Sequence, residues 1–274
     1  MKQLWTEKYR PKDLSGYVFR DENQKAQIES WIKEGSIPHL LFSGSAGIGK
    51  TTLAKILCNE LDVNEFDIMF ANGSKEGRKI EWVDKLISFC QTIPFGPFKV
   101  VIIDEADYLN KDSVQPALRN LMEEYAATVR FILTCNLSHK IITPLRSRCC
   151  ELHINKTDQT EFTARVATIL VEEGVEFDLD TLDTYVKVAY PDLRKCINLV
   201  QQNYFVEGSG GVISLYDLFS MICKDAGYDM IVTLNGNNII PKFINDIGCI
   251  IVECHCYRFI LNITSNDVFS VIGI

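Results

Sequence analysis

Along the first 155 residues, short apolar runs alternate with amphipathic stretches whose apolar positions recur every three to four residues. The apolar runs predict β-strands at residues 39–42, 67–71, 98–103, 130–135 and 151–154. The amphipathic stretches predict helices at residues 24–34, 51–61, 81–89 and 113–125. The run at 98–103 is typical of a strand that is covered on both faces. Residues 1–155 are therefore predicted to form an α/β domain, a parallel sheet sandwiched by helices.

After residue 155 the pattern changes to acidic amphipathic helices, which predict a small helical lid domain over residues 156–207. These helices are expected to begin near Thr157, Asp180 and Pro191. Residues 208–211 have the composition of a flexible linker and open a third segment, 208–274, whose fold the pattern does not give. That segment has a helix-like run and three strand-like runs, at residues 215–223, 230–234, 247–252 and 259–263.

The composition excludes several classes of protein. Of the 274 residues, 47% are apolar and 23% are charged, which is ordinary for a soluble globular chain. We expect no secretory signal, and no run approaches the roughly 20 apolar residues of a membrane span. Ten scattered cysteines favour a reducing, cytoplasmic location over a disulfide scaffold. A cluster of possible metal ligands lacks a paired C-x-x-C, so a zinc site there is disfavoured: Cys249, Cys254, His255 and Cys256.

The net charge of −8 is unevenly distributed along the chain. Residues 1–155 carry 20 basic and 20 acidic side chains, whereas residues 156–274 carry 8 and 16. This balance argues against a non-specific nucleic-acid binder, so any DNA contact must come from a local cluster. Residues 75–79 form a basic cluster just before a predicted helix, where a phosphate backbone could dock. A solvated loop is the alternative interpretation of that cluster.

Residues 44–51 match the pattern G-x-x-x-x-G-K-[ST] between a predicted strand and a predicted helix, which is the context the motif requires. Glycines let successive backbone N–H groups surround an anion, and the helix N-terminus adds to the attraction. In such a phosphate loop Lys50 would reach the β- and γ-phosphates and Thr51 would bind Mg²⁺. The motif predicts a nucleoside triphosphate site with magnesium.

Polar residues follow two of the predicted strands, at the end of a parallel sheet where ligands bind. Asp104 can hold Mg²⁺ through water, and Glu105 can orient or polarise an attacking water. Asn136 could contact the γ-phosphate or that water, although an asparagine at this place is also a common turn residue.

Two arginines are further candidates. Arg148 lies in a loop, and an arginine is suited to reach across an interface and neutralise charge in phosphoryl transfer. Arg194 lies in the first turn of a predicted helix, where the dipole disfavours a cation, so it is expected to pair with an anion.

The order of these motifs resembles that of the AAA+ ATPases and, more narrowly, of the clamp loaders. The resemblance covers about residues 5–205. It is strongest to the ATPase subunit of tailed-phage clamp loaders, which is itself similar to replication factor C small subunits. The segments that carry it are Tyr-Arg-Pro at 9–11, the loop at 44–51, Asp-Glu-Ala-Asp at 104–107, the helix at 115–125, Thr-Cys-Asn at 134–136, Ser-Arg-Cys at 147–149 and Pro-Asp-Leu-Arg at 191–194.

The resemblance implies an AAA+ nucleotide-binding domain, a helical lid and a Mg²⁺-dependent, DNA-stimulated ATPase. It implies a pentameric spiral, in which identical subunits join one different subunit to open a sliding clamp and place it on primer–template DNA. The compartment would be the cytoplasm, that of the host cell if the protein is viral. Residues 212–274 do not resemble the collar that holds such subunits together, and the net acidity is unusual for a DNA-binding motor.

Site residues follow by position in the matching motifs. The resemblance implies that the adenine is framed by Thr6, Glu7, Lys8, Tyr9 and Val18. It implies that the phosphates are held by Gly47, Ile48, Gly49, Lys50, Thr51 and Thr52. Asn136 and Arg194 would sense the nucleotide of their own chain, and Arg148 would act on that of the neighbouring subunit.

The resemblance also implies residues that connect DNA to hydrolysis. Lys79, beside Arg78, would contact DNA and restrain Glu105 until DNA binds, and Gln115 and Arg119 would couple the two sites. Two other readings remain open: an AAA+ helicase or branch-migration motor, and a non-hydrolysing structural subunit of a replication complex.

Overall fold

The structure is a computed structural model that describes residues 3–77, 81–154, 156–206, 230–235, 238–243, 251–253 and 258–260. The chain divides into two compact units, Met1–Gln202 and Asn203–Ile274. The finer predicted division at residue 155 remains a prediction.

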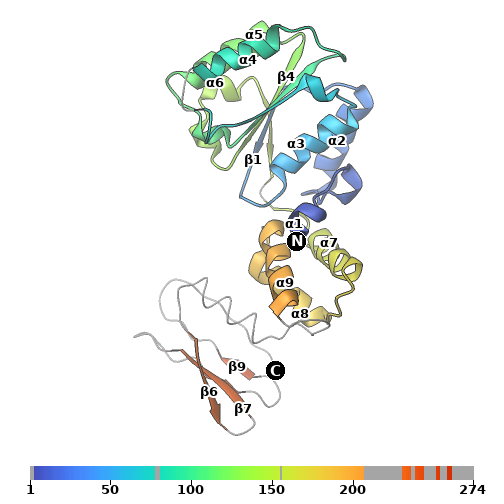
Figure 1. Ribbon diagram of the computed structural model, residues 1–274, viewed down its shortest axis with the longest axis vertical. Coiled ribbons are helices and arrows are strands. Elements are labelled where there is room, and N and C mark those ends of the chain that lie inside the picture. The colour runs from blue at the N-terminus through green and yellow to red at the C-terminus, as the bar shows by residue number, and fades with distance from the viewer. Residues whose placement is uncertain are drawn as a thin grey trace. The chain divides into compact units, whose positions relative to one another are not determined.

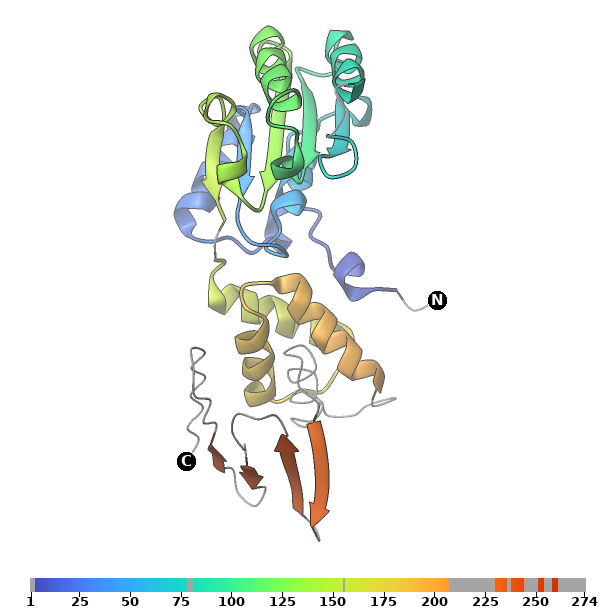
Figure 2. The ribbon, with the colours of Figure 1, turned by 90° about the vertical axis from the view of Figure 1, so that its left-hand side faces the viewer.

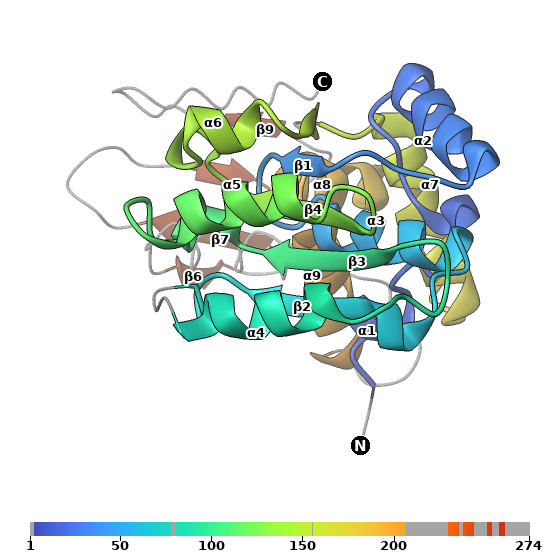
Figure 3. The same ribbon diagram turned by 90° about the horizontal axis from the view of Figure 1, so that it is seen from above.

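The first unit contains a five-stranded parallel sheet with the strand order β2-β3-β4-β1-β5 (Figure 3). Its strands are β1 (Leu40–Ser43), β2 (Ile68–Asn72), β3 (Lys99–Asp104), β4 (Val129–Cys135) and β5 (Cys150–His153). Ser43 pairs with Cys135 on one side and His153 on the other, so three strands end side by side. The predicted parallel α/β sheet is confirmed.

Helices cover both faces of this sheet (Figure 1). One face packs against α4 (Glu81–Gln91), α5 (Val114–Glu124) and α6 (Thr143–Arg146), and the other against α2 (Glu22–Glu34) and α3 (Lys50–Glu60). Alternate side chains of β3 enter the two cores, because Val101 packs on the α4 side and Val100 on the α3 side.

Short turns complete the domain. They are α1 (Trp5–Lys8) and the 3₁₀ turns η1 (Leu14–Gly16), η2 (Glu65–Asp67), η3 (Ala106–Tyr108) and η4 (Ser138–Lys140). Asp21 caps α2 by accepting from the N–H of Gln24, and Gly35 ends the helix in a left-handed conformation.

Three helices follow, α7 (Gln159–Glu172), α8 (Leu179–Ala189) and α9 (Leu193–Val206), and Figure 2 shows them packed against one another. Asp158 and Asp178 cap the first two through backbone N–H groups. The expected apolar stripe of α7 is buried, from Phe162 to Leu170. Among the described residues, no helix is both long and apolar enough to cross a membrane.

The N-terminal segment is tied to two of these helices, α7 and α9. The backbone N–H of Trp5 donates to Gln201 Oε1 of α9 at 3.0 Å, and Gln201 Nε2 donates to the carbonyl of Gln3 at 3.0 Å. Arg165 of α7 donates to the carbonyl of Tyr9 at 3.0 Å. Residues 3–9 are therefore fastened to α7 and α9.

The second unit contains an antiparallel sheet in the order β6-β7-β8-β9. Its strands are β6 (Met230–Asn235), β7 (Asn238–Phe243), β8 (Ile251–Glu253) and β9 (Arg258–Ile260). Three of them overlap the strand-like runs expected from the sequence. The expected linker at 208–211, the helix-like run at 215–223 and the cluster Cys249, Cys254, His255 and Cys256 lie outside the described residues.

Candidate nucleotide site

The phosphate loop connects the end of β1 to the start of α3, as its sequence predicts. Its glycines adopt positive φ angles, 150° at Gly44, 74° at Gly47 and 91° at Gly49. The last of these residues caps α3 in the left-handed conformation. The N-terminus of α3 thus opens directly from the loop, which makes it suited to bind an anion.

Two of these glycines also allow close approach by other segments. An ideal Cβ at Gly44 would lie 1.9 Å from the carbonyl oxygen of Ile154, just past β5. An ideal Cβ at Gly47 would lie 1.7 Å from Asp192 Oδ1, at the start of α9. The loop is therefore enclosed between the sheet and the helical bundle, and a side chain at either position would displace one of them.

Lys50 is buried in the loop and spans it. Its ammonium donates to the carbonyls of Gly44 at 2.8 Å and Ser45 at 2.5 Å, and to Asn136 Oδ1 at 2.9 Å. Burial lowers the pKa of Lys50, with nearby Arg194 acting in the same direction. The predicted phosphate ligand and the predicted sensor asparagine are thus in direct contact.

The carboxylate of Asp104, at the end of β3, accepts hydrogen bonds from two hydroxyl groups. Its Oδ1 accepts from Thr51 Oγ1 at 2.6 Å and from Thr134 Oγ1. The hydroxyl of Thr134 in turn accepts from the N–H of Glu105 at 3.3 Å. A hydroxyl and a carboxylate side by side are oxygen ligands that suit Mg²⁺, so these two side chains fit the predicted metal site.

The backbone at Glu105 is unusual, since this non-glycine residue has a φ of 54°. An ideal Cβ at Gly73, beyond β2, would lie 2.5 Å from its carbonyl oxygen. A backbone held in a sparsely populated conformation at a strand end is often associated with a functional site.

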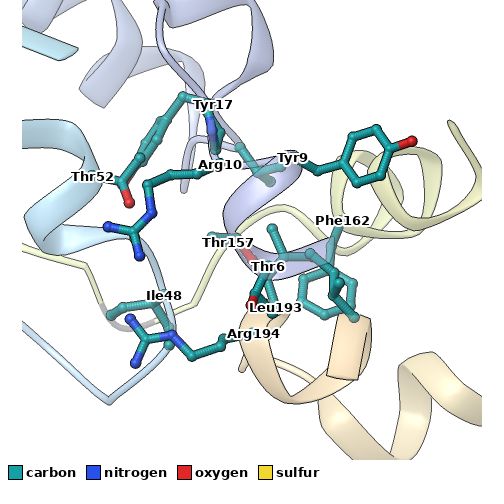
Figure 4. A pocket seen from close by; sticks show the side chains of 15 residues that line it. Thr6, Tyr9, Arg10, Tyr17, Ile48, Thr52, Thr157, Phe162, Leu193 and Arg194 are labelled. Atoms are coloured by element: carbon teal, nitrogen blue, oxygen red, sulfur yellow. The ribbon is translucent and has the colours of Figure 1, made fainter. Parts of the chain in front are cut away.

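The described residues form two adjoining pockets at this end of the sheet. The first has apolar walls and is lined by Thr6, Tyr9, Arg10, Pro11, Tyr17, Val18, Gly47, Ile48, Gly49, Thr52, Thr157, Phe162, Leu193, Arg194 and Ile197 (Figure 4). The second is polar and is lined by Arg10, Ala46, Gly47, Gly49, Lys50, Thr51, Thr52, Asp104, Glu105, Thr134, Cys135, Asn136 and Arg194. Their linings suit a nucleoside beside a polyphosphate.

Most of the site residues proposed from the sequence meet in these two pockets, with Arg194 lining both. Glu7 and Lys8 do not line either one. The ammonium of Lys8 pairs with Glu173 at 2.8 Å, and that hydrogen bond raises the pKa of Lys8. Glu7 accepts from Arg10 at 2.5 Å.

Arg148 lies away from both pockets of its own chain. Its guanidinium donates to Glu123 of α5 and to the carbonyl of Pro144. Its side chain is partly exposed, so it is accessible from outside the domain.

The predicted coupling residues are found in two environments. Gln115 is fully buried, and its amide group donates to the carbonyls of Leu109 and Lys140 and accepts from the N–H of Ile142. It therefore fastens α5 to the loops that follow β3 and β4. Arg119 is partly exposed and donates to Asn120, while Arg78 and Lys79 lie outside the described residues.

Several residues of the site were not found from the sequence. Arg10 lines both pockets, and Figure 4 shows its guanidinium on the same side as that of Arg194, toward the loop. Its position after Tyr9 in the Tyr-Arg-Pro segment was the available signal. Asp107 is buried and accepts from the N–H of Leu137 at 3.3 Å, which positions the neighbouring Asn136.

Comparison with known proteins gives the family. Residues 40–158 match the model of the ATPase family associated with various cellular activities (AAA). The replication factor C small subunit of Picrophilus torridus is 34% identical over 261 residues, covering 90% of this chain and 80% of that protein. The subunit from Methanocella arvoryzae is 41% identical over 204 residues, covering 73% of this chain, which spans only 62% of that relative.

A solved structure shares the fold at lower sequence similarity. The RuvB Holliday junction branch migration motor of Thermotoga maritima superimposes with a TM-score of 0.64 at 23% identity, covering 78% of this chain and 72% of that one. At that identity the likeness concerns the fold alone, an AAA+ domain, whereas the curated relatives carry the closer relationship. The chain belongs to the family of replication factor C small subunits.

Proposed function

We propose that the chain binds and hydrolyses ATP to load a sliding clamp onto primer–template DNA during replication. The observation that carries this proposal is the convergence of Lys50, Asp104 and Asn136 at one polar pocket, in a replication factor C relative. The likeness to a branch-migration motor concerns the fold only, so it does not favour that function.

In this mechanism the chain's own groups prepare the triphosphate for attack. The ammonium of Lys50 would exchange the loop carbonyls for β- and γ-phosphate oxygens, at a comparable hydrogen-bond distance. Glu105 would orient and polarise the attacking water, and Asn136 would contact the γ-phosphate. A magnesium ion held by Thr51 and Asp104 would neutralise part of the phosphate charge.

Arg148 completes the mechanism in trans. It lines neither pocket of its own chain and is partly exposed, as an arginine that serves a neighbouring subunit must be. To reach a γ-phosphate it would exchange its ion pair with Glu123 for the phosphate oxygens. We propose that this exchange requires assembly, so the isolated chain hydrolyses ATP slowly.

The remaining roles follow the same proposal. Lys79 and Arg78 would contact DNA, and Arg119 and the buried Gln115 would pass that contact to the nucleotide site. The three hydrogen bonds of the Gln115 amide group support this role, because they join α5 to the loops that follow Glu105 and Asn136. The pentamer of identical subunits with one different subunit, the cytoplasmic location and the phage origin belong to this proposal as well.

The proposal is tested by ATP hydrolysis with purified components. We expect slow, Mg²⁺-dependent hydrolysis by the chain alone. We expect faster hydrolysis when the companion clamp-loader subunit, a sliding clamp and primed DNA are added and sizing chromatography shows a larger assembly. Full-rate hydrolysis by a monomer, or no stimulation within the assembly, would contradict clamp loading.

A further inference from the structure

Two side chains that line the apolar pocket carry a buried hydroxyl group with no hydrogen-bond partner among the described residues. The hydroxyls are Tyr17 Oη and Thr157 Oγ1, and each residue is only 6% exposed. A buried hydroxyl that is left unpaired is costly to a fold, so each such group needs an explanation. Both residues line the same pocket, although 140 positions separate them in the sequence.

The two hydroxyls are held in place by their surroundings. The ring of Tyr17 meets Phe19 edge-on, with centroids 5.0 Å apart, and contacts the loop, since an ideal Cβ at Gly49 would lie 2.9 Å from its Cε2. Thr157 is fixed through its backbone, because its carbonyl accepts from the hydroxyl of Tyr190 at 2.6 Å. The ring of Tyr17 and the backbone of Thr157 are thus positioned before a ligand enters, which favours binding.

Their pocket is the one suited to the nucleoside. Both residues line the pocket whose walls include Val18, Ile48 and Phe162, and neither lines the polar pocket that contains Lys50. A tyrosine hydroxyl is protonated at neutral pH, and burial raises the pKa of Tyr17 further, so this group can donate. Nitrogens of a base and oxygens of a ribose are the acceptors that a nucleotide would bring there.

We propose that Tyr17 and Thr157 are specificity-determining residues, whose hydroxyls bind the nucleoside part of the nucleotide. Tyr17 approaches from the segment after η1 and Thr157 from the connection between β5 and α7. The two would therefore hold the nucleoside from separate segments of the chain. This inference rests on the proposed function, in that it takes the pocket to be that of ATP.

The test removes each hydroxyl without changing the shape of the side chain. Tyr17→Phe and Thr157→Val are compared with the wild type by calorimetric titration with ATP and with inorganic tripolyphosphate, both with Mg²⁺. We expect each variant to bind ATP roughly tenfold more weakly. Affinity for tripolyphosphate should not change, because it has no nucleoside. Thermal unfolding of the free variants should show unchanged or higher midpoints, because an unpaired hydroxyl has been removed.

Matched controls remove the same atoms elsewhere. Tyr125→Phe lies at the end of α5, and Thr168→Val removes a hydroxyl that donates to the carbonyl of Ala164 on α7. Both should bind ATP as the wild type does. The inference is overturned if Tyr17→Phe and Thr157→Val bind ATP normally, if they lose ATP and tripolyphosphate equally, or if they only lower the unfolding midpoint.

A further variant separates this inference from the proposed function. Lys50→Ala should lose affinity for both ATP and tripolyphosphate, because it acts on phosphates. If Lys50→Ala binds ATP normally, the proposed function fails. If Lys50→Ala loses ATP while both hydroxyl variants keep it, only the inference about the hydroxyls fails.

Discussion

The ammonium of Lys50 lies 2.9 Å from Oδ1 of Asn136, so this side-chain hydrogen bond joins the phosphate loop to the residue that follows β4. These residues are 86 positions apart in the sequence. They meet because β1 and β4 are neighbours in the sheet and end at the same level. A phosphate that draws Lys50 from the loop carbonyls would therefore also act on the asparagine.

Replacing Lys50 should remove nucleotide binding. In Lys50→Ala the pocket loses its buried cation and a donor to the phosphates, so we expect ATP affinity to fall about 100-fold or more in calorimetric titration. Lys55→Ala is the matched control on the same helix, because Lys55 is exposed and lies over the ring of Phe70. Equal affinity of Lys50→Ala and Lys55→Ala would contradict the assignment of the phosphate site.

Replacing Glu105 should separate binding from hydrolysis. Glu105→Gln keeps the shape of the side chain but cannot polarise water as a carboxylate does, so turnover should fall roughly 10²–10⁴-fold. ATP affinity with Mg²⁺ should stay near that of the wild type. Asp104→Asn should instead lower the affinity for Mg²⁺, so that added Mg²⁺ strengthens ATP binding less than in the wild type. Titrations with ATP at rising Mg²⁺ concentrations would measure this. Normal turnover by Glu105→Gln would exclude it as the water-polarising group.

Replacing Arg148 should affect only the assembled protein. Arg148→Ala should bind ATP normally, because the residue lines neither pocket of its own chain. DNA-stimulated hydrolysis should fall roughly 10³–10⁵-fold, the usual contribution of an arginine supplied in trans. Glu123→Gln removes the partner of Arg148 without removing the arginine, so it should keep stimulated hydrolysis. Stimulated turnover by assembled Arg148→Ala at the wild-type rate would reject the trans role.

A methyl group at Gly47 should disturb the site beyond its effect on the backbone. Gly47→Ala would strain a φ of 74° and also collide with Asp192, which directly precedes α9. Gly35→Ala is the control, because its φ of 66° is similar but nothing lies within 4 Å of the added carbon. Both should lower stability by about 1 kcal/mol through strain, and Gly47→Ala should lower it further because of the collision. Only Gly47→Ala should weaken ATP binding, and equal affinities would show that the approach of Asp192 is not needed.

Sequence patterns predicted the parts of the site that are formed by continuous segments. The phosphate loop, the acidic end of β3 and the asparagine after β4 each follow a strand, so the parallel sheet brings them to one edge. The apolar run at 98–103 does not reveal the role of Lys99. The buried ammonium of this residue lies 3.8 Å from the buried carboxylate of Asp67. An ion pair of this kind depends on which strands are neighbours.

The walls of the apolar pocket could not be predicted in the same way. Tyr17, Thr157 and Leu193 come from three separate segments, and no local pattern shows that they meet in one pocket. Gln115 shows the same limit, because its burial and three hydrogen bonds depend on loops that follow two different strands. The position of Lys8 in its motif predicts a residue of the adenine pocket, but its ammonium forms an ion pair with Glu173, just after α7.

The attachment of residues 3–9 to α7 and α9 has a mechanical consequence. Gln201 and Arg165 hold the backbone at Gln3, Trp5 and Tyr9, and the next residue is Arg10, which lines both pockets. Any rotation of the helical bundle against the sheet must therefore carry two guanidinium groups at once, Arg10 from the leading end of the chain and Arg194 from α9. A triphosphate bound by both groups would restrict that rotation. The orientation of the bundle would then depend on whether the pocket holds a triphosphate.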